Sequence, residues 1–120
     1  RQKRLEALGV EVVATPWGES GMDLRYVLED IGSRGVRGVL VEGGGDTAGR
    51  FLRSGLVDKM TVFYAPKVLG ADGVPMIGAL GLTSVQDAPR FCLSGVEPLG
   101  DDLAVTFYPR KEGADVHGLG

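Results

Sequence analysis

The chain is 120 residues long, which is enough for one ordinary domain and too short for two. Its 13 Lys and Arg against 16 Asp and Glu give a net charge of −3, which argues against a nucleic-acid binder. No apolar run approaches the roughly 18 residues of a membrane span. The single cysteine, Cys92, and the single histidine, His117, exclude an internal disulfide and a His/Cys zinc cluster. We therefore expect a cytoplasmic domain with no metal site that binds neither nucleic acid nor a membrane.

The first 41 residues contain two predicted strands and two predicted helices. Residues 1–9 are typical of a helix that ends at Gly9, and the β-branched stretch 10–14 predicts a strand. Asp23 is suited to the N-cap of a helix, because apolar residues follow it at the i, i+3, i+4, i+7 spacing of an amphipathic helix. The stretch 36–41 ends in three apolar residues and predicts a central strand covered on both faces.

The rest of the chain continues the alternation of helix and strand. This alternation predicts an α/β sheet with crossover helices, and the last two strands predict an antiparallel hairpin added to that sheet. Residues 110–120 show no periodicity and are expected to form a flexible tail. The expected elements are a helix from Gly45 or Asp46 to Gly55, a strand over 61–65, an irregular stretch over 66–81, and strands over 90–96 and 103–108.

Glycine is over-represented, at 20 of 120 residues against a usual share of ~7%. Gly43, Gly44 and Gly45 are consecutive and lie between a predicted strand and a predicted helix. A helix N-terminus presents unpaired N–H groups and a partial positive charge, and glycine lets a phosphate approach the backbone closely. We interpret the unit 36–55 as a binding site for a phosphate-bearing cofactor. The alternative is a tight turn without a ligand, because the spacing matches neither common phosphate-binding motif.

The stretch VLVEGGGDTAGRFLRSGLVDKMTVFYAPKVLG, residues 39–70, strongly resembles the reductase domain of the riboflavin-biosynthesis bifunctional deaminase/reductase. The shared features are VEGG, a helix ending in SGLVD, and a strand leading into APKVLG. The resemblance extends over residues 23–109. It implies the dihydrofolate-reductase-like α/β fold, in which helices flank a sheet that ends in an antiparallel hairpin. It also implies NADPH-dependent reduction of 5-amino-6-(5-phosphoribosylamino)uracil to the ribitylamino product.

The resemblance also implies roles for single residues, although it assigns no catalytic residue. Glu42 would hydrogen-bond the ribose hydroxyls of the substrate; the alternative is a salt bridge to a neighbouring cation such as Lys67. Apart from the resemblance, Arg50 is a candidate for contact with the 2′-phosphate of NADPH; the alternative, more usual for an arginine on a helix surface, is that it is solvated. A cis peptide is implied between the first two glycines of the run. The residues expected to bind the cofactor are Gly43, Gly44, Gly45, Asp46, Thr47, Ala48, Gly49 and Arg50.

The family's reductase domain extends further toward its N-terminus than this chain does. Residues 1–109 are therefore expected to be the C-terminal portion of a reductase domain, with other substrate- and nicotinamide-binding residues elsewhere. We also expect a homodimer, from the resemblance and because Tyr64, Phe107 and Tyr108 are expected near one sheet edge. Two alternatives remain open: another dihydrofolate-reductase-like NADPH reductase with a different substrate, and a dimerisation module without catalysis.

Overall fold

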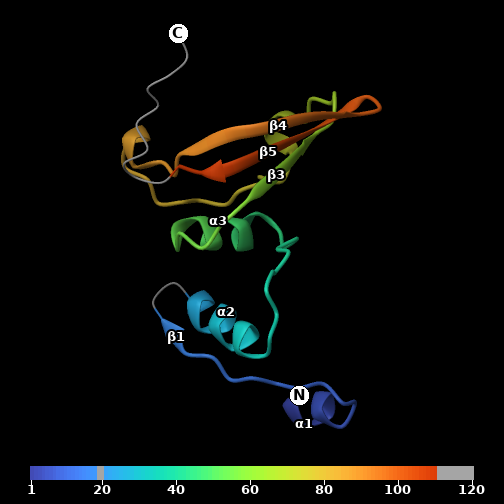
Figure 1. The fold of residues 1–120 in the computed structure, drawn as a ribbon, viewed down its shortest axis with the longest axis vertical. Helices are drawn as coiled ribbons and strands as arrows, with labels where there is room; N and C mark the ends of the chain where they lie inside the picture. The colour runs from blue at the N-terminus through green and yellow to red at the C-terminus, as the bar shows by residue number, and fades with distance from the viewer. Residues whose placement is uncertain (19–20, 111–120) are drawn as a thin grey trace. The chain divides into compact units, whose positions relative to one another are not determined.

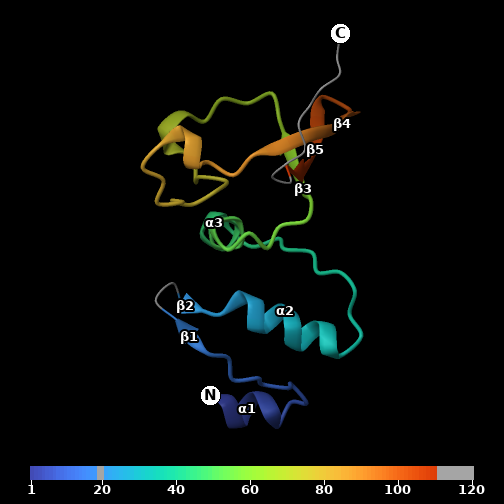
Figure 2. The ribbon, with the colours of Figure 1, turned by 60° about the vertical axis from the view of Figure 1, so that its left-hand side comes forward.

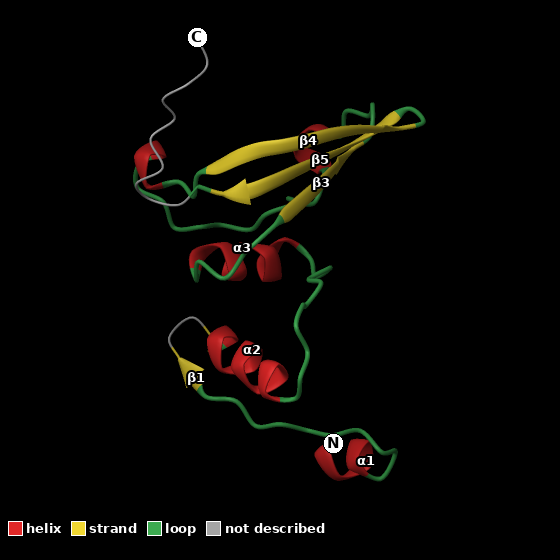
Figure 3. Cartoon of the chain, in the orientation of Figure 1, coloured by secondary structure: helices red, strands yellow, loops and turns green. Residues whose placement is uncertain are grey.

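The computed structural model describes residues 1–18 and 21–110, and the chain divides into two compact units, Arg1–Leu40 and Val41–Gly120 (Figure 1). Residues 111–120 of the predicted tail lie outside the described residues. Within the described ranges, no helix has the length and apolar character needed to cross a bilayer. The elements in chain order are α1 (Gln2–Glu6), β1 (Trp17–Gly18), β2 (Gly21–Met22), α2 (Leu24–Ser33), α3 (Gly45–Arg53), β3 (Met60–Tyr64), the 3-10 helices η1 (Gly70–Asp72) and η2 (Val85–Asp87), β4 (Phe91–Leu99) and β5 (Asp102–Pro109) (Figure 3).

The helix α2 of the first unit begins where the sequence predicts. The Asp23 carboxylate accepts hydrogen bonds from the backbone N–H groups of Arg25 and Tyr26, at 2.9 and 3.1 Å. These bonds satisfy two of the donors that every helix N-terminus leaves unpaired. Leu24 is buried and begins the apolar stripe, while the rest of α2 is half-buried or exposed.

The helix α3 of the second unit ends at the predicted glycine. Gly55 adopts a left-handed φ of +62° and donates its N–H to the carbonyl of Leu52 at 3.1 Å. The N–H of Leu56 reaches back to the carbonyl of Phe51, also at 3.1 Å. This pair of bonds is the Schellman motif, which needs a residue without a Cβ at the left-handed position. The predicted Gly9 has the same conformation after α1, with φ +77°.

The strands predicted over 10–14 and 36–41 are absent, so these two predictions are wrong. Both stretches lack a strand assignment, and their apolar side chains are exposed, with Leu40 at 81%. A strand is completed by N–H and C=O partners on a neighbouring strand, and a parallel strand needs a crossover connection to reach one. Among residues 1–18 and 21–110, no strand pairs with either stretch.

The predicted antiparallel hairpin is confirmed, and its second strand lies in the middle of the sheet. The strand order is β3-β5-β4, with β5 antiparallel to both neighbours (Figure 1). The long connection between β3 and β4 holds both 3-10 helices; it runs out beside the sheet and returns past α3 (Figure 2). The buried apolar side chains of the second unit are Leu52 on α3, Val62 on β3 and Ala104 on β5.

The sheet register separates the three aromatic residues expected near one edge. Phe107 and Tyr108 belong to the central strand, and as neighbours along it they point to opposite faces. Tyr64 pairs with Leu103 and Phe107 pairs with Met60, at opposite ends of the β3–β5 ladder. The grouping is therefore wrong, and it no longer supports a dimer.

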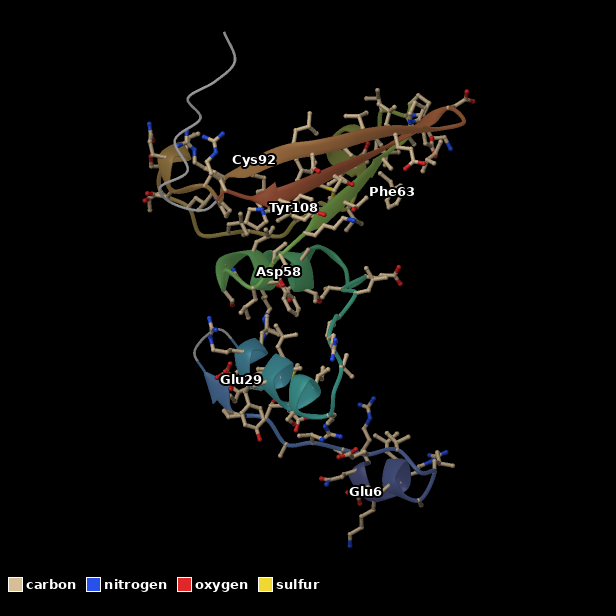
Figure 4. The ribbon with its side chains drawn as sticks, in the orientation of Figure 1. Glu6, Glu29, Asp58, Phe63, Cys92 and Tyr108 are labelled. Carbon is tan, nitrogen blue, oxygen red and sulfur yellow. The ribbon has the colours of Figure 1, made fainter. Side chains whose placement is uncertain are left out.

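The strand β4 contains a bulge that the sequence pattern does not reveal. Leu93 pairs with Phe107 and Gly95 pairs with Thr106. The register therefore moves by two residues along β4 while it moves by one residue along β5. Ser94 is the extra residue. Few side chains of the sheet are buried, and many are exposed, such as Phe63 and Tyr108 at 68% and 45% (Figure 4).

An ion-paired cluster connects the first unit's extended stretch to the end of α2. The Arg34 guanidinium donates from Nε to Asp30 Oδ2 at 2.9 Å and from Nη1 to Glu11 Oε2 at 2.5 Å. The hydrogen bond from Arg34, reinforced by its charge, holds the pKa of Glu11 below its ordinary value of 4.5. A carboxylate whose pKa falls on folding stabilises the folded state above the unfolded pKa, and loses that effect as the pH falls through the folded pKa.

We predict that Glu11→Gln speeds amide hydrogen exchange in the last turn of α2 at pH 7, because the pair to Arg34 is lost. The effect is expected to be modest, because the side chains are exposed. It should shrink below pH 4.5 and vanish once wild-type Glu11 is protonated as well. Glu29→Gln, on an exposed position of α2, is the control. An effect of equal size at low pH would contradict the assignment.

Candidate functional site

The glycine run leads directly into α3, as predicted. Gly44 is the N-cap residue, and the helix begins at Gly45. No side chain of residues 1–18 or 21–110 caps this terminus, so its first N–H groups are open to water or to a ligand. The Asp46 carboxylate lies exposed in the first turn, where its negative charge interacts favourably with the positive end of the helix dipole.

Two glycines of α3 are required by the protein's own packing. Residues 75–79, which we call the strap, cross the helix at Gly45 and Gly49. A Cβ on Gly45 would lie 2.3 Å from the Pro75 carbonyl oxygen, and one on Gly49 would lie 3.2 Å from the Gly78 carbonyl oxygen. Gly78 fits in return, since its own Cβ would lie 3.1 Å from the Gly45 carbonyl oxygen. The distance of 2.3 Å between a Gly45 Cβ and the Pro75 carbonyl oxygen is a steric clash, and only a shift of the backbone could relieve it.

Gly43 is also explained within the chain. A Cβ at this position would lie 2.7 Å from the Cβ of Thr47, an atom that no rotamer change can displace. The backbone at Gly43 thus passes directly over the Thr47 side chain, which is half-buried. The sequence analysis explained this glycine by a ligand that approaches the backbone closely. In the structure, it is the Thr47 side chain that approaches the backbone of Gly43.

Gly44 differs from its neighbours because nothing in the fold requires it to be glycine. Its φ of −65° and ψ of 178° are accessible to any residue, and a Cβ would have nothing within 4 Å. An open backbone position beside an uncapped helix N-terminus suits an anionic group such as a phosphate. The residues present therefore fit the phosphate of a cofactor at Gly44.

The peptide between Gly43 and Gly44 is trans, so the implied cis bond is wrong. The described residues contain no cis peptide. A non-proline cis bond costs ~2.5–4 kcal/mol and needs surroundings that enforce it. Both glycines are exposed, and a Cβ on Gly44 would meet nothing within 4 Å, so the surroundings supply no such enforcement on that side.

Glu42 lies immediately before the run with its side chain in solvent. Because Glu42 is exposed, its charge needs no buried partner to offset a desolvation cost. In the described part of the chain its carboxylate forms no salt bridge, with Lys67 or any other cation. Glu42 is open to a ligand that approaches the glycine run. Arg50 is half-buried on α3, one turn beyond Asp46.

Sequence reasoning missed the strap and the residue that holds its far end. Arg53 Nη1 donates a hydrogen bond to the Ala79 carbonyl at 2.8 Å, and Gly78 donates its N–H to the Gly45 carbonyl at 2.7 Å. The available signal was the spacing of Gly45, Gly49 and Arg53, since every fourth residue lies on one face of a helix. Two glycines on one helix face indicate that backbone packs against that face.

An apolar hollow of about 180 Å³ lies at the other end of α3, lined by Leu52, Gly55 and Phe91 among others. It is smaller than the ~300–1,000 Å³ of typical ligand pockets. It also lies at the carboxyl end of the helix, where the dipole disfavours an anion. The candidate cofactor site is therefore the N-terminal end of α3.

No group of three His, Cys, Asp or Glu side chains that could hold a metal occurs among the described residues.

The fold is shared with a solved structure of RibD from Acinetobacter baumannii, with a TM-score of 0.79 and 28% identity. That match covers 92% of this chain and 29% of the other. A pyrimidine reductase-like protein from Corynebacterium diphtheriae has the same fold, with a TM-score of 0.77 over 92% of this chain and 44% of that one, at 20% identity. The predicted fold class, an α/β sheet with flanking helices and an antiparallel hairpin, is confirmed.

A family model described as the RibD C-terminal domain matches residues 1–105, and the chain belongs to that family. The resemblance noted in the sequence is thereby confirmed. The riboflavin biosynthesis protein RibD of Bacillus amyloliquefaciens is 29% identical over 120 residues, which is 98% of this chain and 32% of that protein. A 2,5-diamino-6-ribosylamino-4(3H)-pyrimidinone 5′-phosphate reductase of Aquifex aeolicus is 27% identical over 88 residues, 72% of this chain and 38% of that protein. The chain thus spans about a third of the length of these curated relatives.

We predict that Gly45→Ala destabilises the protein by roughly 1–3 kcal/mol, the usual cost of overpacking. Gly44→Ala should change stability by no more than about 0.5 kcal/mol, because its Cβ meets nothing. Urea denaturation of the two variants measures the difference. Equal stability of the two variants would show that the strap does not pack on Gly45.

Proposed function

We propose that this chain forms the cofactor-binding part of an NADPH-dependent reductase of riboflavin biosynthesis, which reduces 5-amino-6-(5-phosphoribosylamino)uracil to its ribitylamino product. Membership of the RibD C-terminal domain family and the pyrimidinone phosphate reductase among its relatives support a pyrimidine reductase. The observation that carries the cofactor assignment is the open glycine, Gly44, at the uncapped start of α3. The activity is proposed for the complete gene product, because the chain spans only about a third of its relatives.

The proposed cofactor site uses backbone more than side chains. The N–H groups of the first turn of α3 would bind the pyrophosphate, with Gly44 leaving room for it and Thr47 adding a hydroxyl. Arg50, one turn further along the helix, is proposed for the 2′-phosphate that distinguishes NADPH. The remaining members of the site, Gly43 to Gly49, shape this turn. When bound, the nicotinamide supplies the hydride, and the chain supplies position and electrostatics.

Glu42 is the proposed substrate contact. Its carboxylate is exposed beside the glycine run and unpaired among the described residues, so it can accept hydrogen bonds from two hydroxyls of a ribose. A carboxylate there would hold the sugar next to the carbon that is reduced, and could take up a proton when the ring opens. It would thus act at the reacting centre without touching the cofactor phosphates, which it repels.

We also propose that the gene product is cytoplasmic and a homodimer. Exposed apolar side chains on one face of the sheet, such as Leu93 at 62% and Val96 at 53%, are surface that a second copy could cover. A sheet with strands paired on one side only, as at β3, has an edge available for the same purpose.

Two substitutions separate the cofactor half of the site from the substrate half. Gly44→Val fills the open approach, so we expect NADPH binding, followed by nicotinamide fluorescence, to be lost. Glu42→Gln keeps the size but removes the charge, so NADPH affinity should hold while kcat/KM falls roughly 10- to 150-fold, the value of one charged hydrogen bond. Both are measured in the complete gene product.

Gly95→Val, another glycine whose Cβ would have nothing within 4 Å, is the matched control for Gly44→Val and should bind NADPH like the wild type. The role of Glu42 is withdrawn if Glu42→Gln weakens NADPH as much as Gly44→Val does, or leaves kcat/KM unchanged. A wild-type protein that does not bind NADPH would favour the dimerisation module.

The choice of pyrimidine is tested by offering both substrates. We expect a higher kcat/KM with the phosphoribosylamino-uracil than with the 2,5-diamino-pyrimidinone phosphate named for the Aquifex relative. The two differ in the exocyclic groups of the ring, and a site that hydrogen-bonds one pattern leaves buried groups unpaired with the other. NADPH oxidation followed by absorbance gives both values, and a preference for the pyrimidinone would reassign the substrate.

A further inference from the structure

One face of α3 contacts the strap, residues 75–79, through one residue in each of three successive turns. Gly45, Gly49 and Arg53 are spaced by four residues, so they lie on a single helix face. At the first two positions the missing side chains let strap backbone lie on helix backbone. At the third, the long Arg53 side chain points back along the helix, as helical side chains do, and reaches the strap.

Two hydrogen bonds hold this contact, and they involve the first and last residues of α3, Gly45 as acceptor and Arg53 as donor. The N–H of Gly78 donates to the Gly45 carbonyl at 2.7 Å, and Arg53 Nη1 donates to the Ala79 carbonyl at 2.8 Å. The Arg53 bond has a charged donor, which makes it stronger than a neutral one. The strap is therefore attached to the helix at two adjacent residues.

The Gly78 bond acts on the peptide group that faces the proposed cofactor site. A peptide is planar, so a bond that fixes the Gly45 carbonyl also fixes the direction of the Asp46 N–H in the same plane. That N–H is one of the unpaired donors of the first turn. Leu52, three residues after Gly49 and seven after Gly45, lies on the same face of α3 and is buried. The helix is thus held along this one face, and its donors have a defined direction.

We propose that the strap positions the first turn of α3 for the cofactor phosphates, with Gly78 and Arg53 as positioning residues that do not touch the cofactor. This inference rests on the proposed function and adds a group of residues outside the glycine run to its machinery. The charge on Arg53 serves to hold the strap. NADPH affinity consequently depends on a loop that lies far from the glycine run in sequence.

The test compares Arg53→Met, which keeps the length of the side chain but removes its donors, with Arg53→Lys, which keeps a charged donor. In the complete gene product we expect Arg53→Met to raise the Kd for NADPH roughly tenfold, with kcat at saturating NADPH nearly unchanged. Arg53→Lys should recover part of that loss. Without cofactor, the amide of Gly78 should exchange faster in Arg53→Met than in the wild type. The melting temperature should stay close to the wild-type value, because Arg53 is exposed.

A second variant acts on the same contact from the helix side. Gly49→Ala pushes the Gly78 carbonyl away by a few tenths of an ångström, since its Cβ would lie 3.2 Å from that oxygen. We expect it to raise the Kd as well, and the double variant with Arg53→Met to be little worse than either single one, because both loosen one contact. Arg25→Met, an exposed arginine of α2, is the control and should bind like the wild type.

The outcomes separate this proposal from the proposed function. If Gly44→Val loses NADPH while Arg53→Met and Gly49→Ala bind within about twofold of the wild type, the strap proposal is overturned and the function stands. A fall in melting temperature with unchanged Kd would make the contact structural only, and would also overturn it. Failure of the wild type to bind NADPH would remove the proposed function itself.

Discussion

The N–H of Gly78 reaches the carbonyl of Gly45 because neither residue carries a side chain, and the packing of α3 against the strap depends on this backbone contact. The connection that contains the strap has little apolar burial to order it: Val68 and Val74 are 98% and 92% exposed. Hydrogen bonds and close backbone packing therefore take the place that a hydrophobic contact usually fills. Such contacts are directional, which suits a segment that must hold a helix terminus in one orientation.

The same short helix thus faces three environments. The face with Gly49 and Leu52 is buried and meets the strap, another side carries the exposed Asp46, and the N-terminal end remains uncapped. A helix of nine residues is too short to be stable alone, so these contacts are what keep it formed. Its free donors are available to an anion because the helix is held along one face and not at its N-terminal end. In a RibD C-terminal domain, this division gives a physical reason for a glycine-rich helix where propensity alone would disfavour one.

The elements that the sequence predicted correctly are those whose causes are local. Asp23 caps α2 through bonds to residues two and three positions away, and Gly55 ends α3 within one turn. The strands over 10–14 and 36–41 were predicted from apolar runs alone, and a run does not supply the neighbouring strand that pairing needs.

The site was predictable to the same extent. The position of the glycine run before α3 is a local property, and its start at Gly45 was correct within a residue. The separate reasons for its glycines were not readable, because Gly43 is explained by Thr47, Gly45 by Pro75, and Gly44 by neither. The four-residue spacing of Gly45 and Gly49 indicates that backbone packs on one helix face, but it does not reveal which segment, distant in sequence, supplies that backbone. The cofactor and substrate roles of these residues stay predictions.

The bulge at Ser94 has a consequence for how this strand can change length over evolution. Along a regular strand, gaining or losing one residue turns every later side chain to the opposite face. In β4 the extra residue is already present, so loss of Ser94 would leave Leu93 and Val96 on the face they now share, opposite Phe107 and Val105. Loss of a residue further along the strand would instead turn every later side chain to the opposite face of the sheet. Related chains that differ by one residue in this strand are therefore expected to differ at the bulge.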